Sequence, residues 1–346
     1  MTVSKTLFGR IGNMDVHNFT IVSGDMEVCI SEYGACIQSL KVKDKTGAHR
    51  NVVIGLDTLE EYTANKTYFG AAIGRHSNRI EGAQVTINEV SYDLEKNEGS
   101  NNLHSGANGF HARVFTGKIA GETVEFSLVS PHLDQGFPGT MHLTIIYSLT
   151  DMGGLLIEYK AVSDQDTVCN LTNHSYFNLE GDEGNILDHR ITIAADFYTP
   201  IKAGCLPTGE ILSVKGTPFD FTSEGRIGDP VEAAGSLVAD GFDHNYVLRK
   251  HSDNPAATVC ATGSGICMQV FTTLPGIQFY TGNFLEGISL SKGKTAVKHQ
   301  ALCLETQYFP NAFAYAHFPQ PILKAGEHMT QSTEYRFLVK QAAMFI

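Results

Sequence analysis

The sequence contains no tryptophan, and only 18% of its 346 residues are charged. It has no apolar run approaching the roughly 18 residues of a membrane-spanning helix. Acidic residues outnumber basic ones by 37 to 25, which gives a formal net charge of −12. Because nucleic acids and anionic membranes are bound mainly through clustered lysine and arginine, this balance argues against both as partners. A small neutral ligand is favoured.

The seven cysteines form no C-x-x-C pair, and their odd number leaves one without a partner. This pattern predicts neither a zinc knuckle nor the disulfide framework of a secreted protein. The opening residues, MTVSKTLFGR, also lack the basic and then apolar segments of a secretory signal. We therefore expect a soluble, cytoplasmic protein.

Amphipathic helical periodicity is scarce, and only residues 57–64 suggest a short helix. Alternation of apolar and polar residues recurs instead, as in residues 123–128 and 143–149, and two short runs around Asn88-Glu89 predict a hairpin over residues 84–94. Further strands are expected at residues 26–30, 155–161, 190–194, 268–272 and 335–339. With 34 glycines and 42% hydrophobic residues, the chain is predicted to be one all-β domain, residues 1–346, made of antiparallel sheets.

The segment LETQYFPN, residues 304–311, carries a single carboxylate, Glu305, where an apolar run meets an aromatic turn. A carboxylate at the end of a strand is rigidly held and still reachable by a substrate, as a general base must be. The alternative is a strand-end glutamate that faces water or pairs with a basic side chain.

Two further polar segments precede it in the chain. GRHSNRI, residues 74–80, places Arg75 and Arg79 in a loop, where guanidinium groups can bind hydroxyls or simply anchor the loop. NNLHSGANGF, residues 101–110, places His104 in a glycine-rich loop, either as a functional imidazole or as a solvent-exposed one.

Three more segments complete the series. In NHSYFNL, residues 173–179, polar neighbours surround His174, which is either an oriented proton donor or a core histidine. In GFDHNYVL, residues 241–248, Asp243 either binds a ligand or caps a turn. In GIQFYTGN, residues 276–283, Phe279 and Tyr280 can stack on a sugar ring or belong to the core.

Several other chemistries lack their minimum motifs. The sequence has no H-E-x-x-H, no G-x-x-x-x-G-K-[ST], no strand-to-helix G-x-G-x-x-G and no G-x-S-x-G elbow. The spacing of its fourteen histidines indicates no metal site. We therefore predict neither a metal nor another cofactor.

Taken in order, GRHSNRI, NNLHSGANGF, NHSYFNL, GFDHNYVL and LETQYFPN resemble the motif series of the aldose 1-epimerase (galactose mutarotase) family. The resemblance covers essentially the whole chain. It implies a β-supersandwich of large antiparallel sheets with an open sugar-binding cleft, and an enzyme that interconverts the anomers of a free aldose. It assigns Glu305 as catalytic base and His174 as catalytic acid, and it implies a small aldose as partner and a monomer or weak dimer. The residues expected to contact the sugar are Arg75, Asn78, His104, Asp243 and Phe279.

The chain departs from the family pattern at two positions. Ser105 follows His104 where the family usually has glycine, which questions the backbone freedom of that loop, and Phe115 stands where a tryptophan is common near the cleft. Two other functions stay open. A hexose-6-phosphate 1-epimerase needs a basic cluster for the phosphate, and a non-catalytic sugar-binding module needs no acid and base together.

Overall fold

The computed structural model describes residues 1–181, 184–233, 239–249 and 254–340. Strands dominate these residues, and the α-helices α1 (Leu59–Ala64) and α2 (Gly228–Glu232) are short. No helix in the described part of the chain combines the length and apolar character needed to cross a bilayer. Neighbouring strands of the larger sheets pair antiparallel. The predicted all-β fold of antiparallel sheets is confirmed.

In the described residues, three larger sheets contain most of the strands. The five-stranded sheet has the order β1 (Thr2–Ile11), β2 (Met14–Ser23), β3 (Met26–Ser31), β4 (Ile37–Lys43) and β5 (His49–Asn51). The nine-stranded sheet has the order β11 (Thr116–Ala120), β12 (Thr123–Ser130), β13 (Met141–Thr150), β14 (Gly154–Ser163), β29 (Met329–Val339), β25 (Ile266–Thr272), β24 (Ala257–Cys260), β17 (Arg190–Ile193) and β22 (Gly225–Arg226). The third sheet has the order β21 (Leu212–Ser213), β18 (Ala195–Thr199), β23 (Asp243–Leu248), β26 (Gly276–Tyr280) and β27 (Cys303–Gln307).

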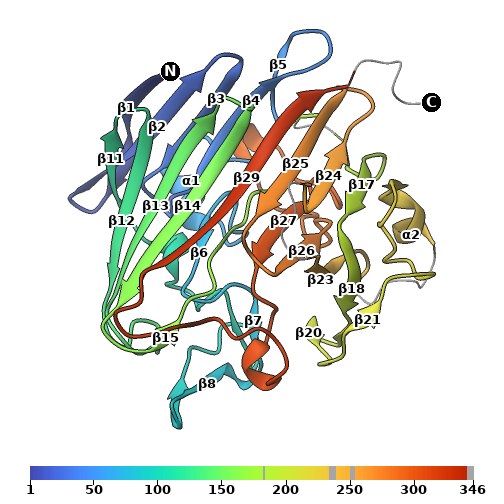
Figure 1. The fold of residues 1–346 in the computed structure, drawn as a ribbon. Coiled ribbons are helices and arrows are strands. Elements are labelled where there is room, and N and C mark those ends of the chain that lie inside the picture. The colour runs from blue at the N-terminus through green and yellow to red at the C-terminus, as the bar shows by residue number, and fades with distance from the viewer. Residues whose placement is uncertain (182–183, 234–238, 250–253, 341–346) are drawn as a thin grey trace.

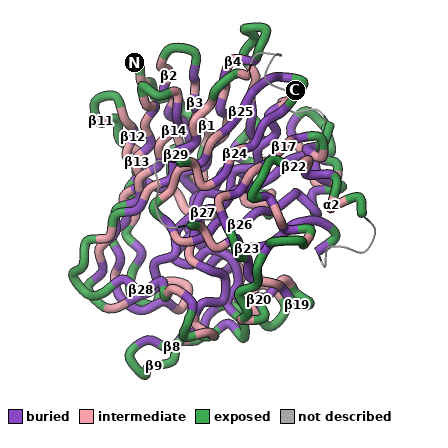
Figure 2. The backbone as a smooth tube through the Cα atoms, turned by 45° about the vertical axis from the view of Figure 1, so that its right-hand side comes forward, coloured by how far each residue is buried: buried purple, intermediate pink, exposed green. Residues whose placement is uncertain are grey.

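One hydrophobic core joins the three sheets. Phe19 of β2 packs edge-on against Phe126 of β12, with ring centroids 5.4 Å apart. On the other side, the hydroxyl of Tyr335 in β29 donates to the backbone carbonyl of Leu304 in β27 at 3.2 Å. Figure 1 accordingly has β14, β29 and β25 in the middle, with β1–β4 on one side and β23, β26 and β27 on the other. Buried residues follow the middle of these strands, while many turns at the outer ends are exposed (Figure 2).

Local sequence signals explain several of the smaller elements. Helix α1 begins at a capping box, in which the Thr58 hydroxyl accepts from the Glu61 amide and the Glu61 carboxylate accepts from the Thr58 amide. The predicted hairpin forms from β8 (Gln84–Ile87) and β9 (Val90–Asp93). Its turn residues Asn88 and Glu89 have φ values of 50° and 66°, as a two-residue hairpin turn requires.

Short strand pairs bring distant loops to the third sheet. β7 (Arg79–Ile80) pairs with β10 (Asn102–Leu103), and β6 (Ala72–Ile73) pairs with β16 (Thr172–Asn173). The remaining pairs are β15 (Thr167–Val168) with β28 (Ile322–Leu323) and β19 (Ile201–Lys202) with β20 (Leu206–Pro207). Because β7 pairs with β10 and β6 pairs with β16, the loops that carry Arg79, His104 and His174 meet beside β27.

One disulfide links Cys260 of β24 to Cys267 of β25, two neighbouring strands. The cysteine pattern predicted no disulfide framework and gave no sign of this single bond. The two cysteines flank the tight turn Thr262–Gly265, so the hairpin itself brings them opposite each other. The other five cysteines are free thiols.

Candidate active site

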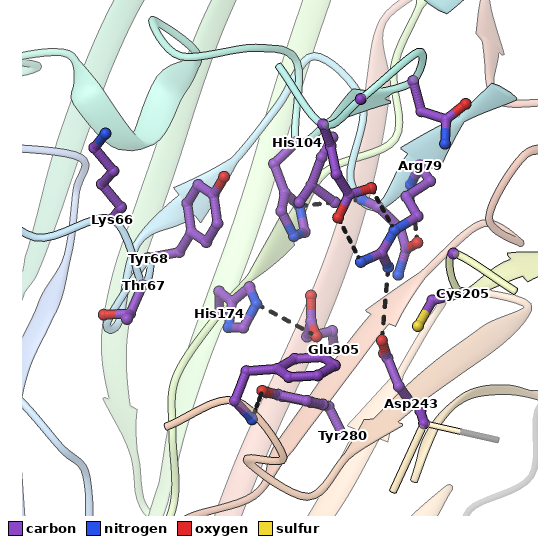
Figure 3. Close-up of a pocket in the computed structure, with 18 of the residues that line it drawn as sticks. Lys66, Thr67, Tyr68, Arg79, His104, His174, Cys205, Asp243, Tyr280 and Glu305 are labelled. Carbon is purple, nitrogen blue, oxygen red and sulfur yellow. Dashed lines mark hydrogen bonds and ion pairs between the residues drawn. The ribbon is translucent and has the colours of Figure 1, made fainter. Parts of the chain in front are cut away.

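A cavity of about 840 Å³ lies over β23, β26 and β27 (Figure 3). Five of the seven predicted site residues line it, although they come from five separate segments of the chain. These residues are Asn78, His104, His174, Asp243 and Glu305. The structure does not place the other two, Arg75 and Phe279, in its lining.

The floor of the cavity is one face of the third sheet. Asp243 lies opposite Tyr280, which lies opposite Cys303, and Gln278 lies opposite Glu305. Residues directly opposite in antiparallel strands point to the same side, and alternate residues along a strand share a face. The polar side chains Asp243, Gln278 and Glu305 are therefore fixed on one rigid surface, while the intervening residues face the core.

Glu305 is almost completely buried at the floor of this cavity, with 2% of its surface exposed. Burial raises the pKa of Glu305 well above its usual range; nearby Asp243 raises it further, while Arg79 opposes the shift. Its Oε1 lies 3.7 Å from Nε2 of His174, and its Oε2 has no hydrogen-bond partner among the described residues. A carboxyl group with a free acceptor atom and a raised pKa is a strong proton acceptor whenever it is in its carboxylate form.

His174 follows β16, and two aromatic rings stack against it. Tyr176 stacks on it with centroids 4.9 Å apart and planes at 18°, and Tyr68 stacks at 5.7 Å and 24°. Burial lowers the pKa of His174 to about 3. The imidazole presents its Nε2 edge toward Glu305, as Figure 3 shows. A buried imidazolium of this kind is a strong acid whenever it forms.

His104 lies beside His174, with ring centroids 5.3 Å apart. Its Nδ1 accepts a hydrogen bond from the backbone N–H of Asn78 at 3.1 Å. Because a neutral imidazole carries one proton, this bond places the proton of His104 on Nε2. Burial, followed by the effect of His174, lowers the pKa of His104 well below its usual value, so the ring stays neutral. His104 is thus a fixed hydrogen-bond donor.

Ser105 does not disturb this loop. His104, Ser105 and Gly106 have φ values of 50°, 68° and 91°, all in the left-handed region. The Ser105 hydroxyl accepts from the amide of His76 at 2.7 Å and donates to its carbonyl at 3.0 Å. These two hydrogen bonds offset the strain that a residue with a Cβ incurs there.

His104, His174 and Glu305 also resemble a metal-binding set, since one ligand atom from each lies within 4.8 Å of the others. A metal requires a free lone pair on the coordinating nitrogen. The Asn78 amide occupies Nδ1 of His104 and thereby keeps the proton on Nε2, the nitrogen left for the cluster. The residues present therefore fit a metal poorly and fit a hydroxyl-bearing ligand well.

Gln278 and Arg79 hold the carboxylate of Asp243 in place. Gln278 donates from Nε2 to its Oδ1 at 2.7 Å, and Nη1 of Arg79 lies 3.6 Å from its Oδ2. Arg79 in turn donates to both carboxylate oxygens of Glu98, at 2.7 and 2.8 Å. This series of contacts fixes the orientation of Asp243 at the cavity wall (Figure 3). Arg79, Glu98 and Gln278 were not among the predicted site residues.

The prediction that Arg75 binds the ligand needs correction. Its guanidinium is 1% exposed and donates to four backbone carbonyls and two hydroxyls, which uses all of its N–H groups. The carbonyls belong to Ser130, Pro131, Pro138 and Gly139, and the hydroxyls to Ser130 and Thr167. Arg75 therefore anchors loops, and Arg79, four residues later, is the arginine that lines the cavity.

Two aromatic expectations also need correction. Phe279 is 0% exposed and stacks on Phe242 in the main core, because it alternates with Gln278 and Tyr280, which share the sheet face of Glu305. Tyr280 is the aromatic residue of β26 that lines the cavity. Phe115 is likewise buried in the main core, against Phe110, and not at the cavity.

Comparison with known proteins gives a consistent result. The family model described as aldose 1-epimerase matches residues 17–336. Galactose mutarotase from Bos taurus is 41% identical, and the match covers 98% of this chain and 99% of that protein. Aldose 1-epimerase from Escherichia coli strain K12 is 34% identical, over 91% of this chain and 93% of that protein.

Solved structures agree in fold. Galactose 1-epimerase from Lactobacillus acidophilus superimposes with a TM-score of 0.87 at 26% identity, over 98% of this chain and 99% of that one. The GalM/aldose epimerase homologue from C. elegans gives a TM-score of 0.88 at 28% identity, over 93% of this chain and 98% of that one. The match of the family model, the extent of these relatives and the geometry of the site lead to one conclusion: the chain belongs to the aldose 1-epimerase family.

Proposed function

We propose that this protein interconverts the α and β anomers of free aldohexoses such as galactose and glucose. The observation that carries the proposal is the pair Glu305 and His174, a buried carboxylate and a buried imidazole 3.7 Å apart on the floor of a cavity. The anomeric hydroxyl and the ring oxygen of an aldose are both bonded to C1. An acid and a base this close together can therefore contact both oxygens of one substrate.

In this proposal the reaction consists of two coupled proton transfers. Carboxylate Glu305 removes the proton of the C1 hydroxyl, and imidazolium His174 delivers a proton from Nε2 to the ring oxygen, so that the C1–O5 bond breaks and a free aldehyde forms. Rotation about C1–C2 exposes the other carbonyl face, and the reverse transfers close the ring. The number of protons is the same before and after, and no metal or nucleotide takes part.

The remaining polar groups suit the recognition of hydroxyls. His104 offers a fixed Nε2–H donor, and Asp243 offers acceptors held in place by Gln278 and Arg79. Both line the cavity with Asn78. A site that hydrogen-bonds hydroxyls rejects analogues that lack them, which supports a free sugar as substrate.

The charges of the cavity favour a free sugar over a sugar phosphate. Its lining includes the acids Glu98, Asp240, Asp243 and Glu305 and the bases Lys66 and Arg79. Arg79 is already paired with Glu98 and Asp243, so Lys66 is the basic side chain of the lining left for a phosphate. We expect little turnover of galactose 6-phosphate beside that of galactose.

The test is polarimetry of freshly dissolved α-D-galactose and α-D-glucose after dialysis of the protein against a chelator. We expect the parent to accelerate both, and Glu305→Gln and His174→Asn each to lower kcat by about 10²- to 10⁴-fold, because each removes one proton-transfer group. Folding is checked by the thermal transition of each variant. A folded Glu305→Gln variant with the parent rate would exclude the mechanism. Turnover that required added zinc or magnesium after chelation would contradict the absence of a cofactor.

A further inference from the structure

The mechanism above requires that the proton of His174 be on the correct nitrogen. Nε2 faces Glu305 and the cavity, so it must gain and lose the transferred proton. Nδ1 must then keep its own proton throughout the cycle, because an imidazole that loses both becomes an anion. Catalytic histidines usually rely on a hydrogen-bond acceptor at this second nitrogen.

A thiol lies at Nδ1, and the backbone of His174 itself also contributes a hydrogen bond to the ring. Sγ of Cys303 lies 3.5 Å from Nδ1 of His174, and both residues are buried. Cys303 begins β27 and faces the same side as Glu305, two residues later, so one strand supports both the base and the partner of the acid. Tyr68 and Tyr176 stack against the ring, so its nitrogen atoms at the edge remain available for polar contacts.

We propose that Cys303 is a positioning residue for His174: its sulfur accepts a hydrogen bond from Nδ1–H and so leaves Nε2 free to exchange a proton with the sugar ring oxygen. This inference rests on the proposed function for its catalytic meaning. The hydrogen bond itself is a property of the resting protein and can be observed without turnover.

A thiol in this position has a different effect from a carboxylate. Burial raises the pKa of Cys303 well above its usual value, so the thiol stays neutral. A neutral sulfur orients the ring but stabilises the imidazolium less than a carboxylate would. The low pKa of His174, caused first by burial, is therefore preserved, and the imidazolium remains a strong acid. Other titratable groups near the ring are Tyr68, Tyr176, His104, His111 and Glu305.

The kinetic test compares Cys303→Ala, Cys303→Ser and a matched control, Cys169→Ala. Cys169 is also a buried free thiol, but it packs in the main core and does not line the cavity. We expect Cys303→Ala to lower kcat for galactose on the order of 5-fold, as the loss of one weak hydrogen bond predicts, with KM within about twofold of the parent. Cys303→Ser keeps an acceptor and should retain most of kcat, and Cys169→Ala should keep the parent values.

The spectroscopic test is the ¹⁵N spectrum of the histidine rings in the whole labelled protein, with His174 assigned by comparison with His174→Asn. We expect a protonated Nδ1 and an unprotonated Nε2 in the parent, and a mixture of the two tautomers in Cys303→Ala. A parent proton on Nε2, or a Cys303→Ala variant with the parent spectrum and kcat, would overturn the inference, as would an equal loss in Cys169→Ala. If the parent did not catalyse mutarotation, the proposed function would fail, while the spectrum would still decide the contact.

Discussion

At the scale of single residues, burial shifts the pKa values of the acid and the base of the site in opposite directions. It raises the pKa of Glu305 and lowers the pKa of His174 to about 3. The resting pair therefore holds one proton over a wide range of pH, mostly on the carboxyl group. The reactive form, carboxylate with imidazolium, is a tautomer of this singly protonated pair.

This arrangement predicts the pH dependence of kcat/KM. Below the plateau the pair gains a second proton, and above it the pair loses its only proton, so both limbs remove the reactive tautomer. We expect a broad bell whose acidic limb falls near the lowered pKa of His174, about 3, and whose alkaline limb falls well above the usual glutamate pKa. Polarimetry of galactose between about pH 3 and 9 measures both limbs. Limbs near about 4.3 and 6.5, the values of isolated Glu and His, would contradict the effect of burial.

Arg75 gives a second prediction at this scale. Lysine offers three donors where the guanidinium satisfies four carbonyls and two hydroxyls, so Arg75→Lys leaves buried acceptors unpaired. We expect a loss of roughly 2 to 5 kcal/mol in the free energy of unfolding, measured with urea, and an unchanged KM for galactose in the folded fraction. Arg79→Lys is the contrasting variant, and it should change KM. A raised KM in Arg75→Lys without lost stability would restore the sugar-binding role.

At the scale of elements, the sequence predicted many strands but not which strands are neighbours. Alternation within residues 276–280 implies that Phe279 and Tyr280 face opposite sides. Only the pairing of β26 with β27 shows that the side of Tyr280 is the side of Glu305. That pairing joins segments more than twenty residues apart, and no local pattern encodes it. The choice between Arg75 and Arg79 failed for a similar reason, since one short loop carries both and its path depends on β7 and β10.

Other features were within reach of the sequence. His104, His174, Asp243 and Glu305 stand in recognisable motifs, and the structure brings all four to one cavity. Cys260 and Cys267 flank a Gly-Ser-Gly turn between two apolar runs, a spacing that places them opposite each other in a hairpin. The hydrogen bond between Asn78 and His104 has no such signal, because it depends on the left-handed backbone of both residues.

Phe279 of strand β26 is expected to support the core and not to bind the sugar. Phe279 packs against Phe242 and Phe221 in the core, so Phe279→Ala removes a buried ring. We expect a loss of about 3 to 5 kcal/mol in the free energy of unfolding, with KM for galactose nearly unchanged in the folded fraction. Thermal and urea unfolding, together with polarimetry, measure the two effects. The opposite pattern, normal stability with a raised KM, would return Phe279 to the sugar-binding site.

At the scale of the whole molecule, buried neutral histidines are spread through all regions of the fold. Burial lowers the pKa to about 3 or 4 at His76, His111, His174, His189 and His244. His76 is the extreme case, since it is 0% exposed and neither ring nitrogen has a partner among the described residues. These side chains are neutral in the folded state at a pH where the unfolded chain binds protons.

The sign of the resulting pH dependence follows from proton uptake. An unfolded histidine titrates near 6.5, so below that pH the unfolded state binds more protons and the free energy of unfolding falls. Each such histidine contributes roughly 1.4 kcal/mol per pH unit until its folded pKa is reached. Glu305 acts in the opposite direction. Because its pKa is raised in the folded state, it stabilises the folded protein below that raised pKa, and this stabilisation is lost as the pH rises through it. The effect of this one carboxyl group on the free energy of unfolding does not offset that of five histidines.

We therefore expect the free energy of unfolding to be highest near neutral pH and to fall steeply between about pH 6.5 and 4. Urea unfolding at constant ionic strength across this range measures the slope. His76→Gln should make the slope shallower by about one proton. If the parent and His76→Gln had the same dependence of unfolding free energy on pH, His76 would be protonated in the folded protein. An unfolding free energy that did not change with pH would show that the buried rings do not remain neutral. Unfolding at low pH would also lower the observed turnover. The acidic limb of kcat/KM must therefore be measured at temperatures where the folded state still predominates.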